Sequence, residues 1–203
     1  MIITIDAQYP QGKVIRRAVD ILKLGGVIAY PTDTTYGIGC DIFSKKAIER
    51  IYQMKRMDRN KPLSFICADL KDISKYSIVT NYAYKAMKKL LPGPFTFVLK
   101  ATKLVPKIML TKRKTVGIRV PDNEICISLV RELGHPIITT SASLADEEIL
   151  SDPIDIERKF GPWVDLIIDG GVLVSETSTV VDLSEDTPKI LRVGKGDPSI
   201  FKG

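Results

Sequence analysis

The chain has 203 residues, of which 44% are hydrophobic and 27% are charged, a composition typical of a globular domain with a buried core. We therefore predict a single domain over residues 1–203. No run approaches the roughly 18 apolar residues of a membrane span, and no leader-like segment precedes the first strand-like residues. These features exclude a membrane protein and favour a cytoplasmic one. Lys and Arg exceed Asp and Glu by 30 to 24, and the resulting charge of +6 is unevenly distributed.

The first third of the chain alternates between strand and helix patterns. Apolar residues recur near a 3.6-residue period after Gly12, and the Gly25-Gly26 pair ends that helix. Ser44 is a suitable N-cap for a second helix. The predicted elements are a strand over Ile2–Ile5, a helix over Gly12–Leu24, a strand over Val27–Tyr30, a helix from Ser44 to about Met54 and a strand over Leu63–Ala68.

The middle of the chain carries no acidic side chain between Asp72 and Asp122, yet it holds 11 of the 30 cations. The rest of the chain has 19 cations against 24 acids and is net negative. Such a positive field attracts phosphates, whether of a nucleotide or of a nucleic acid backbone. An ordinary solvated face is the alternative, although such a face is normally mixed in sign. We select the consecutive cations Lys112, Arg113 and Lys114 as candidates for RNA binding.

The remaining elements continue the alternation with short connections. Helices are predicted over Asn81–Leu91 and Asn123–Leu133, and strands over Phe95–Ala101, Val116–Val120, Ile137–Thr140, Leu166–Asp169, Thr179–Leu183 and Lys189–Val193. This order predicts an α/β fold built on a twisted, mixed sheet with flanking helices. Three widely separated cysteines and one histidine indicate reduced core thiols, and we predict neither a disulfide framework nor a metal site.

Hydroxyl side chains gather where predicted strands end. The segment Pro31–Gly39 contains three threonines around Asp33, and we interpret it as a ligand-binding loop, with a purely structural turn as the alternative. Thr139–Ser143 follows an apolar strand, and Thr177–Thr179 precedes another. The three clusters suggest one shared cavity, with cations available at Lys55, Lys61, Arg119 and Arg192. Arg119 lies within an apolar strand and needs an anionic partner, either a ligand or a protein carboxylate.

Six ordered blocks carry a family resemblance that covers nearly the whole chain. They are GGVIAYPTDTTYGIGCD, Lys55–Pro62, LLPGPFTFVLKAT, KTVGIRVPDN, TTSAS, and STVVDL followed by LRVG. Together they resemble the YrdC-like threonylcarbamoyl-AMP synthase family (YrdC/YciO), and within it the YciO branch. The resemblance implies helices and a twisted mixed sheet around a large, positively charged cavity. It also implies binding of double-stranded RNA or tRNA.

The synthases of this family join L-threonine, bicarbonate and ATP into threonylcarbamoyl-AMP and pyrophosphate, for the threonylcarbamoyladenosine modification of tRNA. The resemblance therefore implies ATP as a substrate, magnesium as its companion ion, and a nucleotidyltransferase reaction. By the same resemblance, Lys55 and Arg119 would be catalytic. The threonine-binding residues would be Thr34, Arg119, Ser141 and Ser178, and the nucleotide-binding residues would be Lys55, Lys61, Thr115, Ser143 and Arg192.

Two of the four signature residues of the synthases are replaced in this chain. The synthase pattern is Lys-x-Arg followed later by Ser-x-Asn, whereas Met57 follows Lys55 at the second position and Ser143 follows Ser141. Methionine cannot donate a hydrogen bond to a phosphate, and serine replaces only part of what asparagine offers. A noncatalytic RNA-binding protein, or an enzyme that uses the same pocket for a related tRNA-modification reaction, therefore stands beside the synthase as an alternative.

Overall fold

The computed structural model describes residues 1–58, 61–110, 112–144, 148–185 and 187–201. Its strands are β1 (Ile2–Thr4), β2 (Val27–Tyr30), β3 (Gly37–Asp41), β4 (Ser64–Ile66), β5 (Ser77–Ile78), β6 (Phe95–Ala101), β7 (Thr115–Arg119), β8 (Ile137–Ser141), β9 (Leu166–Asp169), β10 (Thr179–Asp182) and β11 (Lys189–Arg192). Its α-helices are α1 (Gly12–Lys23), α2 (Lys45–Met54), α3 (Leu70–Tyr76), α4 (Asn81–Leu90), α5 (Glu124–Leu133) and α6 (Pro153–Phe160). Two 3-10 helices, η1 (Lys107–Met109) and η2 (Pro198–Phe201), complete the described elements.

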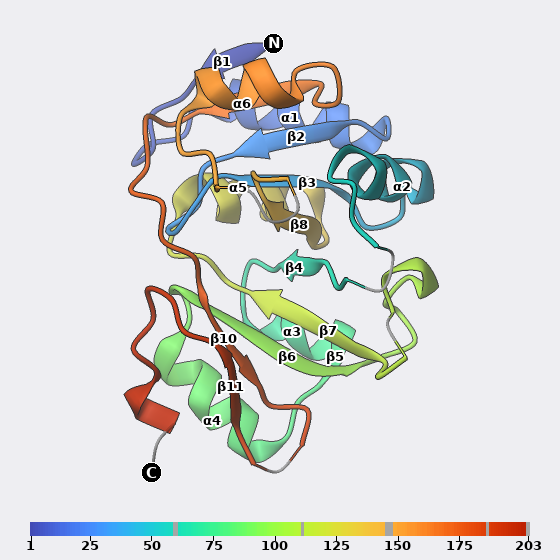
Figure 1. Cartoon of the computed structure of the whole chain (residues 1–203), viewed down its shortest axis with the longest axis vertical. Coiled ribbons are helices and arrows are strands. Elements are labelled where there is room, and N and C mark those ends of the chain that lie inside the picture. Colours follow the sequence, from blue (N-terminus) through green and yellow to red (C-terminus); the bar gives the residue numbers. More distant parts are fainter. Residues whose placement is uncertain (59–60, 111, 145–147, 186, 202–203) are drawn as a thin grey trace.

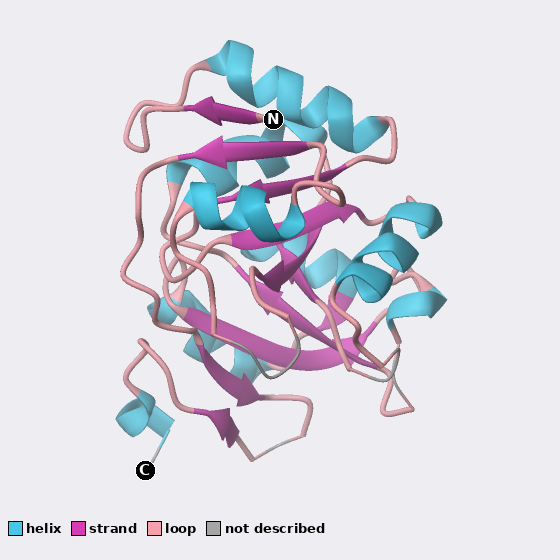
Figure 2. Cartoon of the chain, turned by 45° about the horizontal axis from the view of Figure 1, so that its top comes forward, coloured by secondary structure: helices cyan, strands magenta, loops and turns pink. Residues whose placement is uncertain are grey.

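The strands form one mixed sheet in the order β1-β9-β2-β3-β8-β4-β7-β6-β10-β11, with β5 paired to β6. Parallel and antiparallel pairs both occur: β1 runs parallel to β9, whereas β3 runs antiparallel to β8. In Figure 1, β2 and β3 lie in the upper part of the molecule, β6, β7, β10 and β11 in the lower part, and β4 between them. Figure 2 shows the strands in the middle of the molecule with helices around them. The predicted mixed α/β fold is confirmed.

Two hydrophobic clusters cover the two faces of the sheet, and β2 contributes to both because its side chains alternate. Val27 and Ala29 belong to the larger cluster, while Ile28 and Tyr30 belong to the smaller one. The smaller cluster also contains the buried residues of α1 and those of α5 except Ile127, which belongs to the larger cluster. The three cysteines are free and buried, as their spacing predicted. No α-helix in the described part of the chain is long and apolar enough to cross a bilayer.

Strand β3 corrects the prediction that Pro31–Gly39 is a loop throughout. Gly37 and Gly39 are paired on both sides, with β2 and with β8. A Cβ atom at Gly39 would clash with the carbonyl oxygen of Ile138, so glycine is what allows β8 to approach. Within Pro31–Gly39, only the residues between the end of β2 at Tyr30 and the start of β3 at Gly37 therefore form a loop. Helices α3 and α6, the 3-10 helices and strand β5 were also missing from the prediction.

Candidate active site

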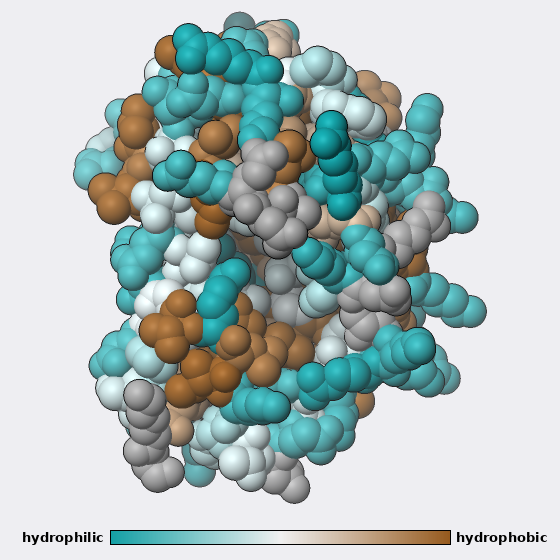
Figure 3. All heavy atoms as spheres, viewed as in Figure 1, coloured by the Kyte–Doolittle hydropathy of each residue, from teal (hydrophilic) through white to brown (hydrophobic). Residues whose placement is uncertain are grey.

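A cavity of about 710 Å³ opens on the sheet, where strands from both halves of the molecule contribute their ends. The face shown in Figure 3 is recessed near its centre, with hydrophilic side chains to the right of the recess and a hydrophobic patch to the lower left. The residues that line the cavity are Thr32, Thr35, Gly37, Pro62, Ser64, Thr96, Val98, Lys112, Arg113, Thr115, Gly117, Arg119, Thr139, Thr140, Ser141, Thr177, Ser178, Val180, Leu191 and Arg192.

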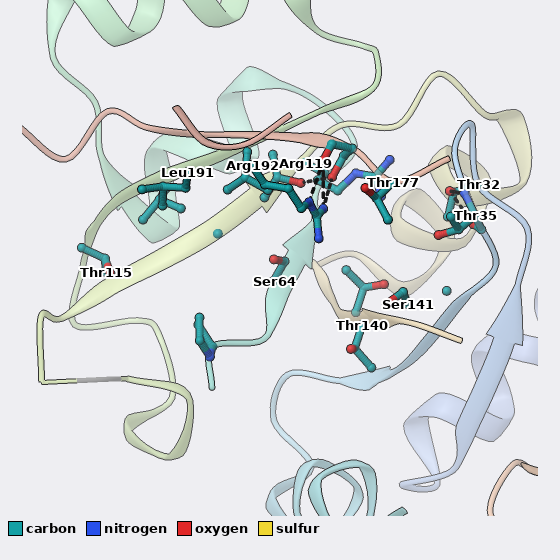
Figure 4. Close-up of a pocket in the computed structure, with 18 of the residues that line it drawn as sticks. Thr32, Thr35, Ser64, Thr115, Arg119, Thr140, Ser141, Thr177, Leu191 and Arg192 are labelled. Atoms are coloured by element: carbon teal, nitrogen blue, oxygen red, sulfur yellow. Dashed lines mark hydrogen bonds between the residues drawn. The ribbon is translucent and has the colours of Figure 1, made fainter. Parts of the chain in front are cut away.

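The described lining residues include cations and hydrogen-bond donors but no acidic side chain. Four of the described lining residues are cations and ten carry a hydroxyl group, whereas none of them is Asp or Glu. Hydroxyl groups can donate hydrogen bonds to anionic oxygens, and cations in a partly closed cavity concentrate a positive potential. The cavity therefore fits anionic ligands. Figure 4 shows how the threonines and serines surround Arg119 and Arg192.

Arg119, at the end of β7, is held by one of its terminal nitrogens. Its Nη2 donates to Asp33 Oδ1 at 2.7 Å and to Thr34 Oγ1 at 2.9 Å. The two side chains of the ion pair are only 10% and 8% exposed. Arg119 Nε and Asp33 Oδ2 are buried without a partner, so the pair makes one bond where a two-pronged contact has room for two. Arg119 therefore has a protein carboxylate as its partner, inside the site.

Arg192, at the end of β11, is also anchored to the cavity wall. Its Nε and Nη2 both donate to the carbonyl oxygen of Ser178, at 3.1 and 2.9 Å, and Nη2 lies 3.2 Å from Ser178 Oγ. Partial burial, and next the charge of Arg119, lower the pKa of Arg192. The two guanidinium groups therefore repel one another, and an anion bound near both of them would offset this repulsion.

Lys55 is the C-cap residue of α2 and is only 3% exposed. Its Nζ donates to the carbonyl oxygen of Ser141 at 2.6 Å and approaches Ser143 Oγ at 3.4 Å. Burial, and next the neighbouring Lys61, lower the pKa of Lys55 to about 8. Among the described residues, the hydrogen bonds of this ammonium group go only to neutral oxygen atoms.

The predicted site residues divide into two groups. Arg119, Ser141, Ser178, Arg192 and Thr115 line the cavity, as do Lys112 and Arg113. Thr34, Lys55, Lys61 and Ser143 lie outside the lining, although Thr34 contacts Arg119 and both Lys55 and Ser143 lie against Ser141. Lys61 and Lys114 are exposed.

One of the three candidate RNA-binding cations is already paired within the protein. Arg113 Nη2 lies 2.9 Å from Asp182 Oδ2, and the side chain of Asp182 is only 5% exposed. Hydrogen bonds from Ser184 and the charge of Arg113 lower the pKa of Asp182, against the opposing effect of burial. Arg113 is therefore less available to a phosphate than its two neighbours.

Sequence reasoning missed three polar residues of this region. Ser64 and Thr96 line the cavity from the buried strands β4 and β6, and Asp33 holds Arg119. The signal was present for Ser64 and Thr96, because each is a single hydroxyl residue within an otherwise apolar strand. For Asp33 the sequence offered only a turn residue, and its pairing with a residue 86 positions away depends on the tertiary structure.

The described residues do not fit a resident metal ion. No group of three or more His, Cys, Asp or Glu side chains in this part of the chain could hold one. The cavity lining offers hydroxyl groups instead of the carboxylates that magnesium prefers.

The comparisons with known proteins identify the family and the fold of the chain. Residues 20–194 match the family model described as telomere recombination, which covers Sua5, YciO and YrdC. The chain belongs to the Sua5/YciO/YrdC family. Escherichia coli YciO is 45% identical over 194 residues, which are 95% of this chain and 94% of that protein. The crystal structure of YciO superposes with a TM-score of 0.95 at 43% identity and covers 99% of this chain and 98% of its own.

Two further members of the family have names that bear on activity. The threonylcarbamoyl-AMP synthase of Nitrosococcus oceani is 35% identical over 157 residues, 77% of this chain and 85% of that protein. The structure of Pyrococcus abyssi Sua5 complexed with L-threonine superposes with a TM-score of 0.90 at 29% identity. That match covers 96% of this chain and 57% of the Sua5 chain.

The loop after α2 shows where one signature replacement lies. Met57 is partly buried and packs against the larger hydrophobic cluster, so its side chain belongs to the core. Arg56 has a φ of 50°, an unusual conformation for a residue other than glycine. Ser143, the other replacement, lies beside Lys55. Both departures from the synthase pattern therefore lie close to the buried Lys55, Met57 in sequence and Ser143 in space.

Proposed function

We propose that the cavity binds L-threonine together with ATP, and that the protein is an enzyme of the threonylcarbamoyl-AMP synthase type. The observation that carries the proposal is the cavity lining, in which two anchored guanidinium groups and ten hydroxyl residues face a space without carboxylates. A carboxylate and a triphosphate are the anionic groups of the two substrates, and both need such donors. The family relationship to threonylcarbamoyl-AMP synthases supports the choice of ligands.

The reaction places simple demands on the protein. The neutral amine of threonine combines with bicarbonate to form a carbamate, and the amine proton leaves with the bicarbonate hydroxyl group as water. A carbamate oxygen then attacks the α-phosphorus of ATP, and the bond from that phosphorus to the oxygen of the leaving pyrophosphate breaks. Two anions must be brought together, which cations and hydroxyl donors achieve by positioning and charge neutralisation. In this scheme Arg119 holds the carboxylate of threonine, and Lys55 and Arg192 neutralise charge on the phosphates.

Because Met57 and Ser143 replace two signature residues of the synthases, the experiment must measure whether the synthase reaction still takes place. The purified protein is incubated with labelled L-threonine, bicarbonate and ATP with magnesium, and pyrophosphate and the adenylate are quantified. The proposal requires pyrophosphate release that depends on threonine. Release that does not depend on threonine, or no release despite ATP binding, would contradict it. Arg192→Gln serves as the matched site variant, because it removes one anchored guanidinium from the cavity.

RNA binding is a second candidate function, and a specific observation favours it. Lys112 lines the cavity and is exposed, and Lys114 is exposed two residues away. Neither forms an ion pair with a described residue. A polyanion that reaches the cavity mouth would therefore meet unpaired lysines from the acid-free segment. This candidate is compatible with the first, because a tRNA and a small adenylate could use the mouth and the floor of one cavity.

A further inference from the structure

A second cavity lies outside the candidate active site, between α2 and the segment that connects β6 to β7. It has a volume of about 650 Å³ and shares no lining residue with the first cavity. One wall comes from the end of β3 and the start of α2, and the other wall comes from the consecutive residues Lys103–Ile108. In Figure 1, both of these segments lie on the right side of the molecule. The reaction proposed above does not use this cavity.

The lining of the second cavity differs in chemistry from that of the first. Seven of its ten described lining residues are apolar, and the other three are Lys45, Lys103 and Lys107. None of the ten carries a carboxylate, hydroxyl or amide side chain, whereas the first cavity has ten hydroxyl residues. Lys103 and Lys107 are exposed and form no ion pair with a described residue, and Lys45, whose side chain is 77% exposed, lies 4.0 Å from Glu49. The second cavity is therefore an apolar surface with exposed cations around it.

Two large apolar residues of this cavity are exposed, although local contacts hold them in place. Phe43 is 66% exposed and Leu104 is 59% exposed. The backbone N–H of Phe43 donates to Asp41 Oδ1 at 2.8 Å, and its ring makes an edge contact with His135, with 4.8 Å between the ring centroids. The backbone N–H of Leu104 donates to Thr102 Oγ1 at 3.3 Å. Because the exposed apolar surface is already ordered, a partner that covers it loses less conformational entropy on binding.

We propose that this cavity docks an acidic segment of a partner protein, in which apolar side chains stand next to several carboxylates. The apolar side chains cover Phe43 and Leu104, and the carboxylates pair with Lys103 and Lys107. Charge complementarity selects an acidic segment over a basic one, because a basic segment would bring like charges together. The inference does not depend on the proposed function, since no residue of the first cavity takes part in it.

Nucleic acid is the other polyanion that the three lysines could attract, but the lining favours a protein segment. Sequence-specific recognition of RNA uses hydrogen bonds to the edges of unstacked bases, and this lining has no hydroxyl or amide side chain to make them. A duplex backbone offers phosphates to the lysines and leaves the apolar residues of the cavity exposed to water. An acidic segment with apolar side chains matches both parts of the lining.

The test selects ligands for the full chain from a random peptide library displayed on phage. Enriched peptides should combine Asp or Glu with Leu, Ile, Phe or Met, and their affinities are measured by fluorescence anisotropy with labelled synthetic copies. Phe43→Ser with Leu104→Ser should weaken the binding at least about tenfold, because it removes the apolar contacts. Lys103→Glu with Lys107→Glu should also weaken it at least about tenfold, because it replaces attraction by repulsion. All four side chains belong to exposed residues, so both double variants should keep the fold.

The matched control is Lys85→Glu with Lys88→Glu, which makes the same change in charge at two exposed residues of α4. Its affinity for the peptides should stay within about twofold of the wild-type value, because salt screens distant charges. The lysine pair still decides the question should Phe43→Ser with Leu104→Ser fail to fold.

Three results would overturn the proposal. The first is a selection that enriches no acidic peptides, and the second is an enriched peptide that binds both double variants as tightly as it binds the wild type. The third comes from a labelled RNA duplex as the comparison ligand. If Lys103→Glu with Lys107→Glu weakens the binding of the duplex but not that of the peptides, the cavity is part of a nucleic acid surface instead.

Discussion

At the scale of single residues, the site contains two buried cations, and the protein compensates the charge of only one of them with a carboxylate. Arg119 is neutralised by Asp33, whereas the described residues give Lys55 only a carbonyl and a hydroxyl group. An uncompensated buried ammonium group lowers its own pKa, because burial penalises the charged form. The pKa of Lys55 is therefore lowered by burial, whereas the charge of Arg119 is compensated within the protein by Asp33.

Lys55 gives the first prediction, a pH-dependent contribution to stability. Its pKa is about 8 in the folded protein against 10.5 for an exposed lysine, so the unfolded chain binds more protons between these two values. The destabilisation by charged Lys55 is complete below pH 8 and disappears as the pH rises towards 10.5. The free energy of unfolding of the wild type, relative to Lys55→Met, should rise by up to about 3 kcal/mol over this range. Urea unfolding of both proteins measures this difference.

The control for this experiment lies on the same helix. Lys45 is an exposed residue of α2, and the side chain is 77% exposed. The difference between Lys45→Met and the wild type should stay nearly constant over the same pH range. A constant difference for Lys55→Met as well would mean that Lys55 is as hydrated as Lys45.

The second prediction concerns the ion pair of Asp33 and Arg119. Arg119→Leu leaves the carboxylate of Asp33 buried and unpaired, which should reduce the free energy of unfolding by about 3 to 5 kcal/mol. Asp33→Asn combined with Arg119→Leu removes both charges and should recover a large part of that loss. Chemical denaturation of the two single variants and the double variant provides the cycle. Additive losses would show that the two charges do not interact.

At the scale of elements, the acid-free segment provides the third prediction. Its tip between β6 and β7 presents Lys112 and Lys114, whereas Arg113 is paired with Asp182. Lys112→Glu with Lys114→Glu should weaken the binding of double-stranded RNA and lower the slope of log affinity against log salt by about two units. Filter binding at several salt concentrations measures this slope. Lys13→Glu with Lys23→Glu, on the exposed face of α1, changes the net charge equally and should leave the slope nearly unchanged.

Most elements could be predicted from the sequence because their patterns are local. Helix α5 follows its N-cap Asn123 and ends at Gly134, which adopts the left-handed conformation with a φ of 85°. Strand β3 could not be recognised, because Gly37 and Gly39 are favoured in loops and serve here to let β8 approach. Helix α3 could not be predicted for a different reason. It has seven residues, of which only Ile73 and Tyr76 are buried, and these are too few to show a helical period of apolar residues.

The site was predictable in part for the same reason. Hydroxyl residues at strand ends and the buried Arg119 stand out in a single sequence, and the structure brings Arg119, Ser141, Ser178 and Arg192 to one cavity. The hydrogen bonds that connect these groups could not be predicted from the sequence alone. The bond from Lys55 to Ser141 joins residues 86 positions apart, and it depends on the position of β8 in the sheet.

At the scale of the whole molecule, the cavity joins distant parts of one sheet. Ser141 ends β8, Arg119 ends β7 and Arg192 ends β11, so ligands that fill the cavity should couple both halves of the sheet. The fourth prediction is that ATP and L-threonine together slow hydrogen exchange of backbone amides in residues 139–143, 177–179 and 192–195. Exchange in α1, which packs on α5, should not change. Protection restricted to one of the three segments would indicate that the ligands contact only one half of the cavity.

The position of Arg192 also has a consequence for the newly synthesised protein. Strand β11 is the last strand of the chain, and the sheet reaches it only through β10, which pairs with β6 more than 80 residues earlier. The residues up to Arg192 must therefore leave the ribosome before the second guanidinium group can enter the cavity. Nascent chains that still hold β11 inside the exit tunnel would already carry Arg119 paired with Asp33, but they would lack the second half of the anion site. Any ligand contact that needs Arg192 is thus possible only after β11 has paired with β10.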